Sequence, residues 1–209
     1  MVGVQIADQW TALADEFTLE KTVAALESHG FKVLVAENGA DAKQKVLDIV
    51  PEGTDVFTAA SATLASIGVT EEINESGRYD SVRKKITGLD RATHGREMRQ
   101  LGATPTYVLG SAQAITEQGY LLFASFGGSQ LTSYAQGAEK VIWVVSTQKI
   151  VKDIDAGLRR IDEHALPLES QRLQKVFGRE SAAHKILIVR GEVTPGRITV
   201  ILVKEQLGF

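Results

Sequence analysis

Four short polar segments follow stretches with β-strand character, and they combine small residues, hydroxyl groups and, in one case, a lysine. Small residues let the backbone approach a ligand, and hydroxyl and free N–H groups at a helix start suit a carboxylate or phosphate. Lys149 would add a full positive charge. Serine, threonine and glycine are also common in plain turns and caps, so one segment alone would indicate little. Together the four favour one anion site; they are residues 58–63, 110–113, 125–130 and 146–149.

Other chemistries have little support in the sequence. The chain has no cysteine, which excludes disulfides, thiolate metal sites, cysteine-ligated iron–sulfur clusters and a cysteine nucleophile. Dinucleotide-binding, phosphate-loop and serine-hydrolase motifs are missing. The histidines form no ligand pair at i+3 or i+4, so we predict no metal site. We expect each histidine at the surface or at a helix cap; they are His29, His94, His164 and His184.

A polar helix is predicted from Asp90 to Leu101, and its arginines allow two interpretations. Arg91 suits a solvated helix with internal ion pairs. For Arg96 that interpretation stands beside a second one, an arginine that reaches into the site or across a subunit interface.

The overall composition narrows the function classes. A net charge of −3 without long runs of like charge argues against a dedicated nucleic-acid binder. The longest apolar runs, such as residues 141–145, fall well short of the ~20 residues that span a bilayer, and residues 1–10 do not resemble a signal peptide. We therefore expect a cytoplasmic protein with no membrane contact, and its 209 residues suit a single domain over 1–209.

Strand-like and helical segments alternate along the chain, which predicts an α/β fold with a doubly wound, mostly parallel sheet and helices on both faces. Asn38 and Asp153 are expected to cap helices, and residues 111–116 to form a helical turn. Ligands bind at the carboxyl ends of strands in such sheets, so the polar segments would meet there. We expect the last two strands to form a hairpin or two edge strands; the predicted strands are 31–36, 55–58, 107–110, 120–124, 141–145, 185–190 and 197–203.

Several stretches of this sequence resemble the lactate-utilisation (LUD) domain family. The most specific are Gly110–Gly119, the 125–130 loop and Val141–Asp153; residues 90–99 and the end from Pro195 to Phe209 add to the likeness. It covers nearly the whole chain from about Thr18 onward.

The resemblance implies a fold shared with ribose-5-phosphate isomerase, glucosamine-6-phosphate deaminase and CoA transferases. It also implies a role in oxidation of hydroxy acids such as lactate, beside iron–sulfur protein subunits, and a small anionic metabolite as ligand. Without cysteine, the chain resembles the small cluster-free member, and we predict no cofactor of its own. The ligand-binding residues carried over by matching motif are Thr58, Ser61, Ser125, Gly128, Ser129 and Lys149.

The catalytic role stays open at this point. Neither the glutamate nucleophile of the CoA transferases nor the acid/base motif of the sugar-phosphate isomerases has a convincing match. The first hypothesis is a component of hydroxy-acid use that binds an organic acid, a phosphorylated metabolite or a CoA-linked metabolite. The alternatives are a non-catalytic accessory subunit that organises partner proteins, and a stand-alone isomerase or transferase. A homo-oligomer is compatible with each.

Overall fold

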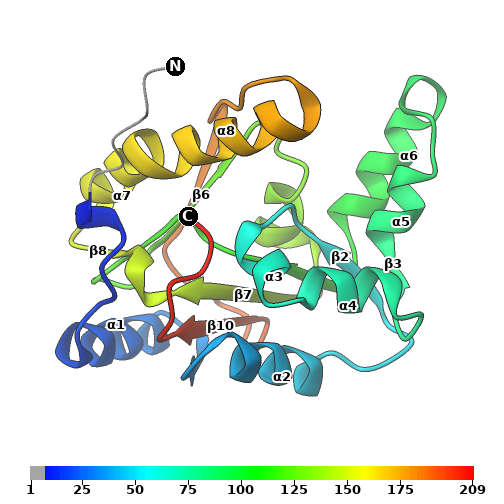
Figure 1. The fold of residues 1–209 in the computed structure, drawn as a ribbon. Helices are drawn as coiled ribbons and strands as arrows, with labels where there is room; N and C mark the ends of the chain where they lie inside the picture. The colour runs from blue at the N-terminus through cyan, green and yellow to red at the C-terminus, as the bar shows by residue number, and fades with distance from the viewer. Residues whose placement is uncertain (1–7) are drawn as a thin grey trace.

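The computed structural model describes residues 8–209, and its central element is a six-stranded sheet whose neighbouring strands all run parallel (Figure 1). The carboxyl ends of its strands therefore form a single edge. The chain's last strand lies inside the sheet. In spatial order the strands are β1 (Lys32–Ala36), β10 (Ile198–Val203), β7 (Lys140–Ser146), β4 (Tyr107–Gly110), β2 (Asp55–Thr58) and β3 (Asp80–Ser81).

A second, smaller sheet packs against one face of the first. Its strands, in order, are β8 (Ile150–Val151), β5 (Ala114–Thr116), β6 (Leu121–Ser125) and β9 (Lys185–Val189). The β5–β8 pair is parallel, whereas β5–β6 and β6–β9 are antiparallel. The predicted α/β fold with a mostly parallel sheet is confirmed, and the small sheet is an addition that the sequence analysis did not foresee.

Helices complete the layers around the two sheets (Figure 1). One face of the main sheet packs against α2 (Gly39–Ile49), α3 (Ala62–Ser66) and α4 (Val69–Glu75). The other face meets the small sheet, flanked by α1 (Glu16–Ser28) and α5 (Val82–Thr87). Beyond the small sheet lie α7 (Ile154–Arg160) and α8 (Leu166–Phe177), and α6 (Arg91–Ala103) stands beside α5. The short helical turns are η1 (Asp8–Trp10), η2 (Ser133–Gly137), η3 (Thr147–Lys149) and η4 (Ile161–Ala165).

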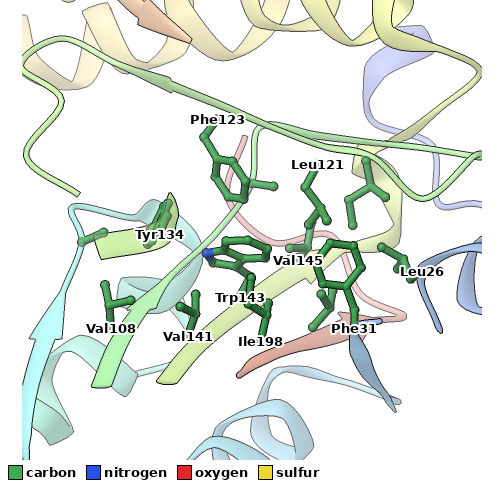
Figure 2. Close-up of a cluster of buried hydrophobic side chains, with 14 of the residues drawn as sticks. Leu26, Phe31, Val108, Leu121, Phe123, Tyr134, Val141, Trp143, Val145 and Ile198 are labelled. Carbon is green, nitrogen blue, oxygen red and sulfur yellow. The ribbon is translucent and has the colours of Figure 1, made fainter. Parts of the chain in front are cut away.

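Aromatic side chains fill the space between the two sheets (Figure 2). Trp143 of β7 is fully buried, and its ring centroid lies 4.5 Å from that of Phe123 on β6 and 5.5 Å from that of Tyr134. Such aromatic pairs contribute about 0.5–1.5 kcal/mol each beyond the area that they bury. Successive β7 side chains point to opposite faces of the main sheet, so this apolar strand contributes side chains to the hydrophobic core on both faces.

The helix ends follow the local sequence signals. Asn38 Oδ1 accepts a hydrogen bond from the Asp41 N–H at 3.0 Å, and Asp153 Oδ1 accepts one from the Ala156 N–H at 2.8 Å. Both side chains pair an N–H group that a helix start leaves without an intrahelical partner. Gly30 ends the first helix with a φ of +86°, a conformation that favours glycine. The caps predicted at Asn38 and Asp153 are confirmed.

Two local expectations are wrong. Residues 114–116 form strand β5, not a helical turn, because they pair with β6 across a turn at Gly119, whose φ is +79°. The two C-terminal strands do not pair with each other and do not both lie at an edge. β9 is an edge of the small sheet, whereas β10 is inserted between β1 and β7. Both segments form strands as predicted, but their pairing partners are distant in the sequence.

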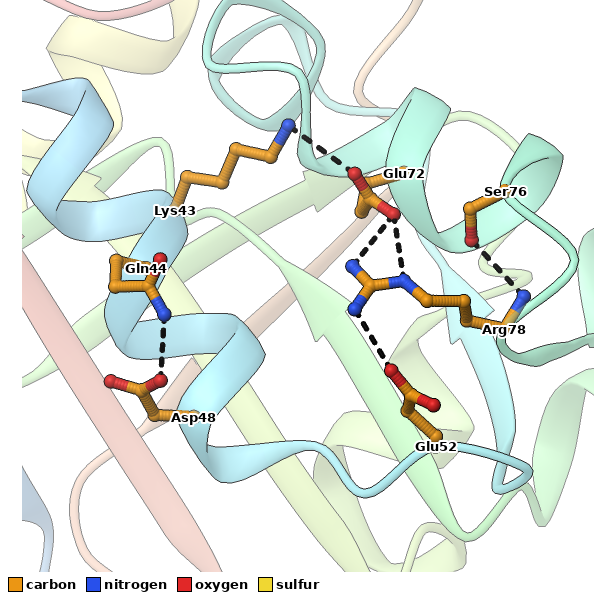
Figure 3. Close-up of polar contacts among 7 residues, drawn as sticks. All are labelled: Lys43, Gln44, Asp48, Glu52, Glu72, Ser76 and Arg78. Carbon is orange, nitrogen blue, oxygen red and sulfur yellow. Dashed lines mark hydrogen bonds and ion pairs between the residues drawn. The ribbon is translucent and has the colours of Figure 1, made fainter.

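Surface ion pairs join the helices on the outer face of the main sheet (Figure 3). Arg78 donates to Glu52 at 2.9 Å and to Glu72 at 2.8 Å, and Lys43 of α2 lies 3.6 Å from Glu72 of α4. The Arg78 hydrogen bond, opposed by some desolvation, lowers the pKa of Glu72. Each charge in this exposed network has an opposite charge beside it.

Within the described range, no helix is both long and apolar enough to cross a membrane. The expectation that residues 1–10 form no signal peptide falls mainly on residues 1–7, which lie outside the described part of the chain.

Candidate functional site

Lys149 connects three of the polar turns at the carboxyl edge of the main sheet. Its Nζ donates to Thr63 Oγ1 at 3.1 Å and to Ser111 Oγ at 3.3 Å. Thr63 begins α3 after β2, Ser111 follows β4, and Lys149 ends the turn η3 after β7. Because β2, β4 and β7 run parallel, the segments that leave their carboxyl ends come together.

The segment after β10 covers this group of turns, and Figure 1 shows it, in red, passing α3. Thr63 Oγ1 donates to the Leu207 carbonyl at 3.3 Å, and Gln148 Nε2 donates to the Gly208 carbonyl at 3.1 Å. Gly208 has a φ of +63°, and a Cβ there would lie 2.4 Å from Thr63 Oγ1, so only glycine fits. Four strand ends thus contribute to one layer of polar atoms.

The Lys149 ammonium group is buried without a carboxylate. The residue is 2% exposed, and no ion pair in the described part of the chain includes it. Burial, and to a smaller extent the positive charge of Arg160, hold its pKa well below the usual 10.5. Hydroxyl groups alone compensate poorly for the lost hydration of a cation, so burial shifts the equilibrium toward the neutral amine.

Two further basic side chains lie behind Lys149, on α7 and the π-helical turn η4 that follows it. Arg160 is fully buried, donating from Nη1 to the Gln113 carbonyl at 2.6 Å and from Nη2 to the Trp10 carbonyl at 3.3 Å. Its Nε has no partner. Burial is the cause that lowers the Arg160 pKa to about 10. Single π-helical turns often occur at functional sites, because they redirect side chains.

His164 is buried as well, at 2% exposure, so the expectation of a surface or capping histidine is wrong for this residue. Burial, then the charges of Arg160 and Lys149, lower its pKa to about 4. The imidazole is therefore neutral near pH 7, and its Nδ1 has no hydrogen-bond partner. Sequence reasoning missed both residues. The available signal was their i, i+4 spacing beside an apolar stripe, which places them on the buried side of one helix.

Lys149, Arg160 and His164, named here the basic cluster, come from elements that only the tertiary structure joins. Their buried atoms include two without partners, and no carboxylate of the described residues balances them. Such an arrangement suits an anion, whose charge would raise the proton affinity of Lys149 and His164 and whose oxygens could accept hydrogen bonds from the Arg160 Nε.

Thr58 lies in a separate buried network near the same edge. Its Oγ1 accepts from Asn74 Nδ2 at 3.0 Å, and its carbonyl accepts from Arg83 Nε at 2.7 Å. Ser81 donates to Asn74 Oδ1 at 2.6 Å. The polar atoms of Thr58 therefore already have protein partners, which indicates that it positions Arg83 and α4 beside the edge.

The remaining predicted site residues divide between two places. Ser61 caps α3 by accepting from the Leu64 N–H at 3.2 Å, two residues before Thr63. The 125–130 loop leaves the small sheet and is internally bonded: the Gly128 N–H donates to Ser125 Oγ at 2.9 Å, and Ser129 donates to Gln130 Oε1 at 3.3 Å. No described hydrogen bond joins this loop to Lys149, so the structure groups Ser61 and Lys149 but leaves Ser125, Gly128 and Ser129 apart.

The α6 helix does not reach the site. Arg96 is exposed and forms no described hydrogen bond or ion pair, and the same holds for Arg91. Neither arginine therefore forms the expected ion pair within α6 among the described residues. The alternative in which Arg96 enters the site of its own chain is also wrong. A groove of about 370 Å³ between α1 and β1 is lined by Glu16, Glu20, Glu27 and Glu37, which does not suit an anion.

Comparisons with known proteins place the chain in a family. Among 14 matching chains of solved structures is a DUF162 family protein from Deinococcus radiodurans. It shares 14% sequence identity, the match covers 92% of this chain and 99% of that one, and the TM-score is 0.57, which supports the fold. No curated protein matches. The LUD domain family model matches residues 19–203, nearly the whole described chain, and the chain therefore belongs to the LUD domain family.

Proposed function

We propose that this protein binds a small organic acid, or a phosphorylated or CoA-linked metabolite, at the carboxyl edge of the main sheet and so contributes to hydroxy-acid use. The observation that carries the proposal is the basic cluster, which buries Lys149 and Arg160 without a carboxylate. Burying a cation costs several kcal/mol unless an opposite charge offsets that cost. Hydrogen bonds to hydroxyl and carbonyl oxygens offset only part of it, whereas a bound anion would supply the missing charge.

Membership in the LUD domain family agrees with a role in lactate utilisation. The chain contains no cysteine, so any cysteine-ligated iron–sulfur clusters used in the oxidation would be held by other subunits. We propose that iron–sulfur proteins in the cytoplasm fill that role and that this protein supplies the metabolite site.

Thermal unfolding in the presence of single ligands tests the metabolite site. We expect millimolar lactate, pyruvate, inorganic phosphate or acetyl-CoA to raise the stability of the wild-type protein. A ligand at one hundred times its Kd adds about 2.7 kcal/mol. Lys149→Met should lose this added stability, because methionine keeps the side-chain length but cannot take up the proton that a bound anion would stabilise on the amine. Lys21→Met changes an exposed lysine that pairs with Glu117, and it should respond to ligands like the wild type.

The outcomes separate the hypotheses. If none of the four ligands stabilises the wild type, the proposed site is wrong and the non-catalytic accessory role becomes the better explanation. If a ligand stabilises Lys149→Met and the wild type equally, that ligand binds elsewhere. Loss of the response in Ser125→Ala would show that the 125–130 loop also contributes, contrary to its internal hydrogen bonding.

A further inference from the structure

The surroundings of Lys149 Nζ meet the requirements of a nucleophilic amine. An amine attacks a carbonyl carbon only in its unprotonated form, and burial among hydroxyl groups favours that form. Thr63 Oγ1 and Ser111 Oγ, at 3.1 and 3.3 Å, hold the nitrogen in place without a negative charge that would keep it protonated. The geometry points to an imine between Lys149 Nζ and the carbonyl carbon of a small 2-oxo acid bound at this edge.

The two hydroxyl groups have different roles in that step. Thr63 already donates its proton to the Leu207 carbonyl at 3.3 Å, so it can only accept a hydrogen bond from Nζ and orient it. Ser111 has a weak contact with the Ala112 carbonyl at 3.4 Å, so its proton is free to turn toward the reacting atoms. Ser111 is half-buried, whereas Lys149, to which it is hydrogen-bonded, is 2% exposed.

The reaction balances without a further reactant. Nζ forms a bond to the carbonyl carbon while a proton moves from Nζ to the former carbonyl oxygen, with the Ser111 hydroxyl as relay. The resulting carbinolamine then loses its hydroxyl group together with the remaining Nζ proton as water, and the carbon–nitrogen double bond remains. Water reverses both steps, so the imine holds the 2-oxo acid reversibly. No electron is transferred and no cofactor is required.

The positive charge of Arg160 would favour a 2-oxo acid over a simple ketone as the ligand. It lies close enough to Lys149 for its charge to affect the amine, and its Nε has no partner. A carboxylate on the carbon next to the carbonyl would supply the opposite charge that Arg160 lacks among the ion pairs of the described residues. We therefore assign Arg160 as a positioning residue for the carboxylate, and 2-oxo acids as the substrate class.

Borohydride trapping tests the imine, which rests on the proposed metabolite site. The wild-type protein is incubated with pyruvate, reduced with sodium borohydride and digested, and the masses of the peptides are measured by mass spectrometry. We expect one carboxyethyl group on Lys149, at a level more than about tenfold above any exposed lysine, because exposed lysines are almost fully protonated near pH 7. Lactate has no carbonyl group and should leave no adduct. Acetone lacks the carboxylate and should label Lys149 much less than pyruvate does.

Three variants complete the design. Lys149→Arg removes the nucleophilic amine and should form no adduct. Lys21→Arg should label like the wild type, and Arg160→Gln should shift the labelling by pyruvate toward the low level seen with acetone. Reduced Lys149 peptide with pyruvate but not with lactate supports the imine. Stabilisation by lactate and pyruvate without any adduct overturns the imine and leaves the metabolite site intact. Equal labelling of all lysines overturns the imine alone, and absence of both stabilisation and adduct overturns both proposals.

Discussion

Basic side chains are buried at both ends of the neighbouring strands β7 and β10, but among the described residues only the one at the amino end has a carboxylate partner. At the amino end, Arg197 donates to Glu192 at 2.6 Å and to the carbonyls of Ala138, Ser133 and Tyr134 at 3.0–3.2 Å. All three of its nitrogens therefore have acceptors, and one acceptor is a carboxylate. At the carboxyl end, Lys149 has two hydroxyl partners, and the Nε of Arg160 has none.

The difference indicates that Arg197 stabilises the fold, whereas the basic cluster is suited to binding a ligand. Arg197 ties the 133–138 segment to the start of β10 and is compensated within the protein. The basic cluster is compensated only in part, so it lowers stability in the absence of a ligand. Uncompensated charge in the interior, combined with shifted pKa values, is typical of functional sites.

The largest expected effects come from changing one residue at each end. Glu192→Ala leaves Arg197 buried without its carboxylate and should lower the free energy of unfolding by about 3 kcal/mol. Lys149→Met, in contrast, removes an uncompensated buried amine and should leave that free energy unchanged or raise it by about 1 kcal/mol. Urea unfolding followed by circular dichroism measures both. Equal losses in the two variants would contradict the comparison.

A second prediction concerns pH. The folded protein holds the His164 pKa at about 4, below the usual 6.5, so the unfolded chain binds more protons between these values. The free energy of unfolding should therefore fall as the pH drops from 6.5 to 4, by about 2.5 kcal/mol from this residue. His164→Leu should flatten this part of the pH profile, whereas His94→Gln, at an exposed position, should not. If His164→Leu had the same pH dependence of the free energy of unfolding as the wild type, another residue would be responsible for the loss of stability.

The smallest effect is expected on the surface. Glu52→Ala removes one of two carboxylates beside Arg78, but both side chains are largely solvated and Glu72 remains in place. The midpoint of thermal unfolding should not change measurably, and added salt should abolish any residual difference. A loss comparable to that of Glu192→Ala would show that exposure does not separate the two kinds of ion pair.

Much of the architecture was readable from local patterns. The alternation of strands and helices, the caps at Asn38 and Asp153 and the doubly apolar strand around Trp143 predicted a parallel sheet. A parallel sheet places its carboxyl ends on one edge, so the meeting of the turns after β2, β4 and β7 followed from the sequence as well. Lys149 was singled out on that basis, although not its neighbours.

Tertiary structure alone decided the rest. The 125–130 loop has the same composition as the other polar turns, but it leaves a different sheet, and composition does not encode which sheet a strand joins. The position of β10 in the middle of the main sheet depends on pairing with β1, which lies far away in the sequence. Arg160 and His164 lie in the site because α7 and η4 pack against the small sheet near Lys149. Their i, i+4 spacing could show that they share one side of a helix, but it does not encode which distant segment that side contacts.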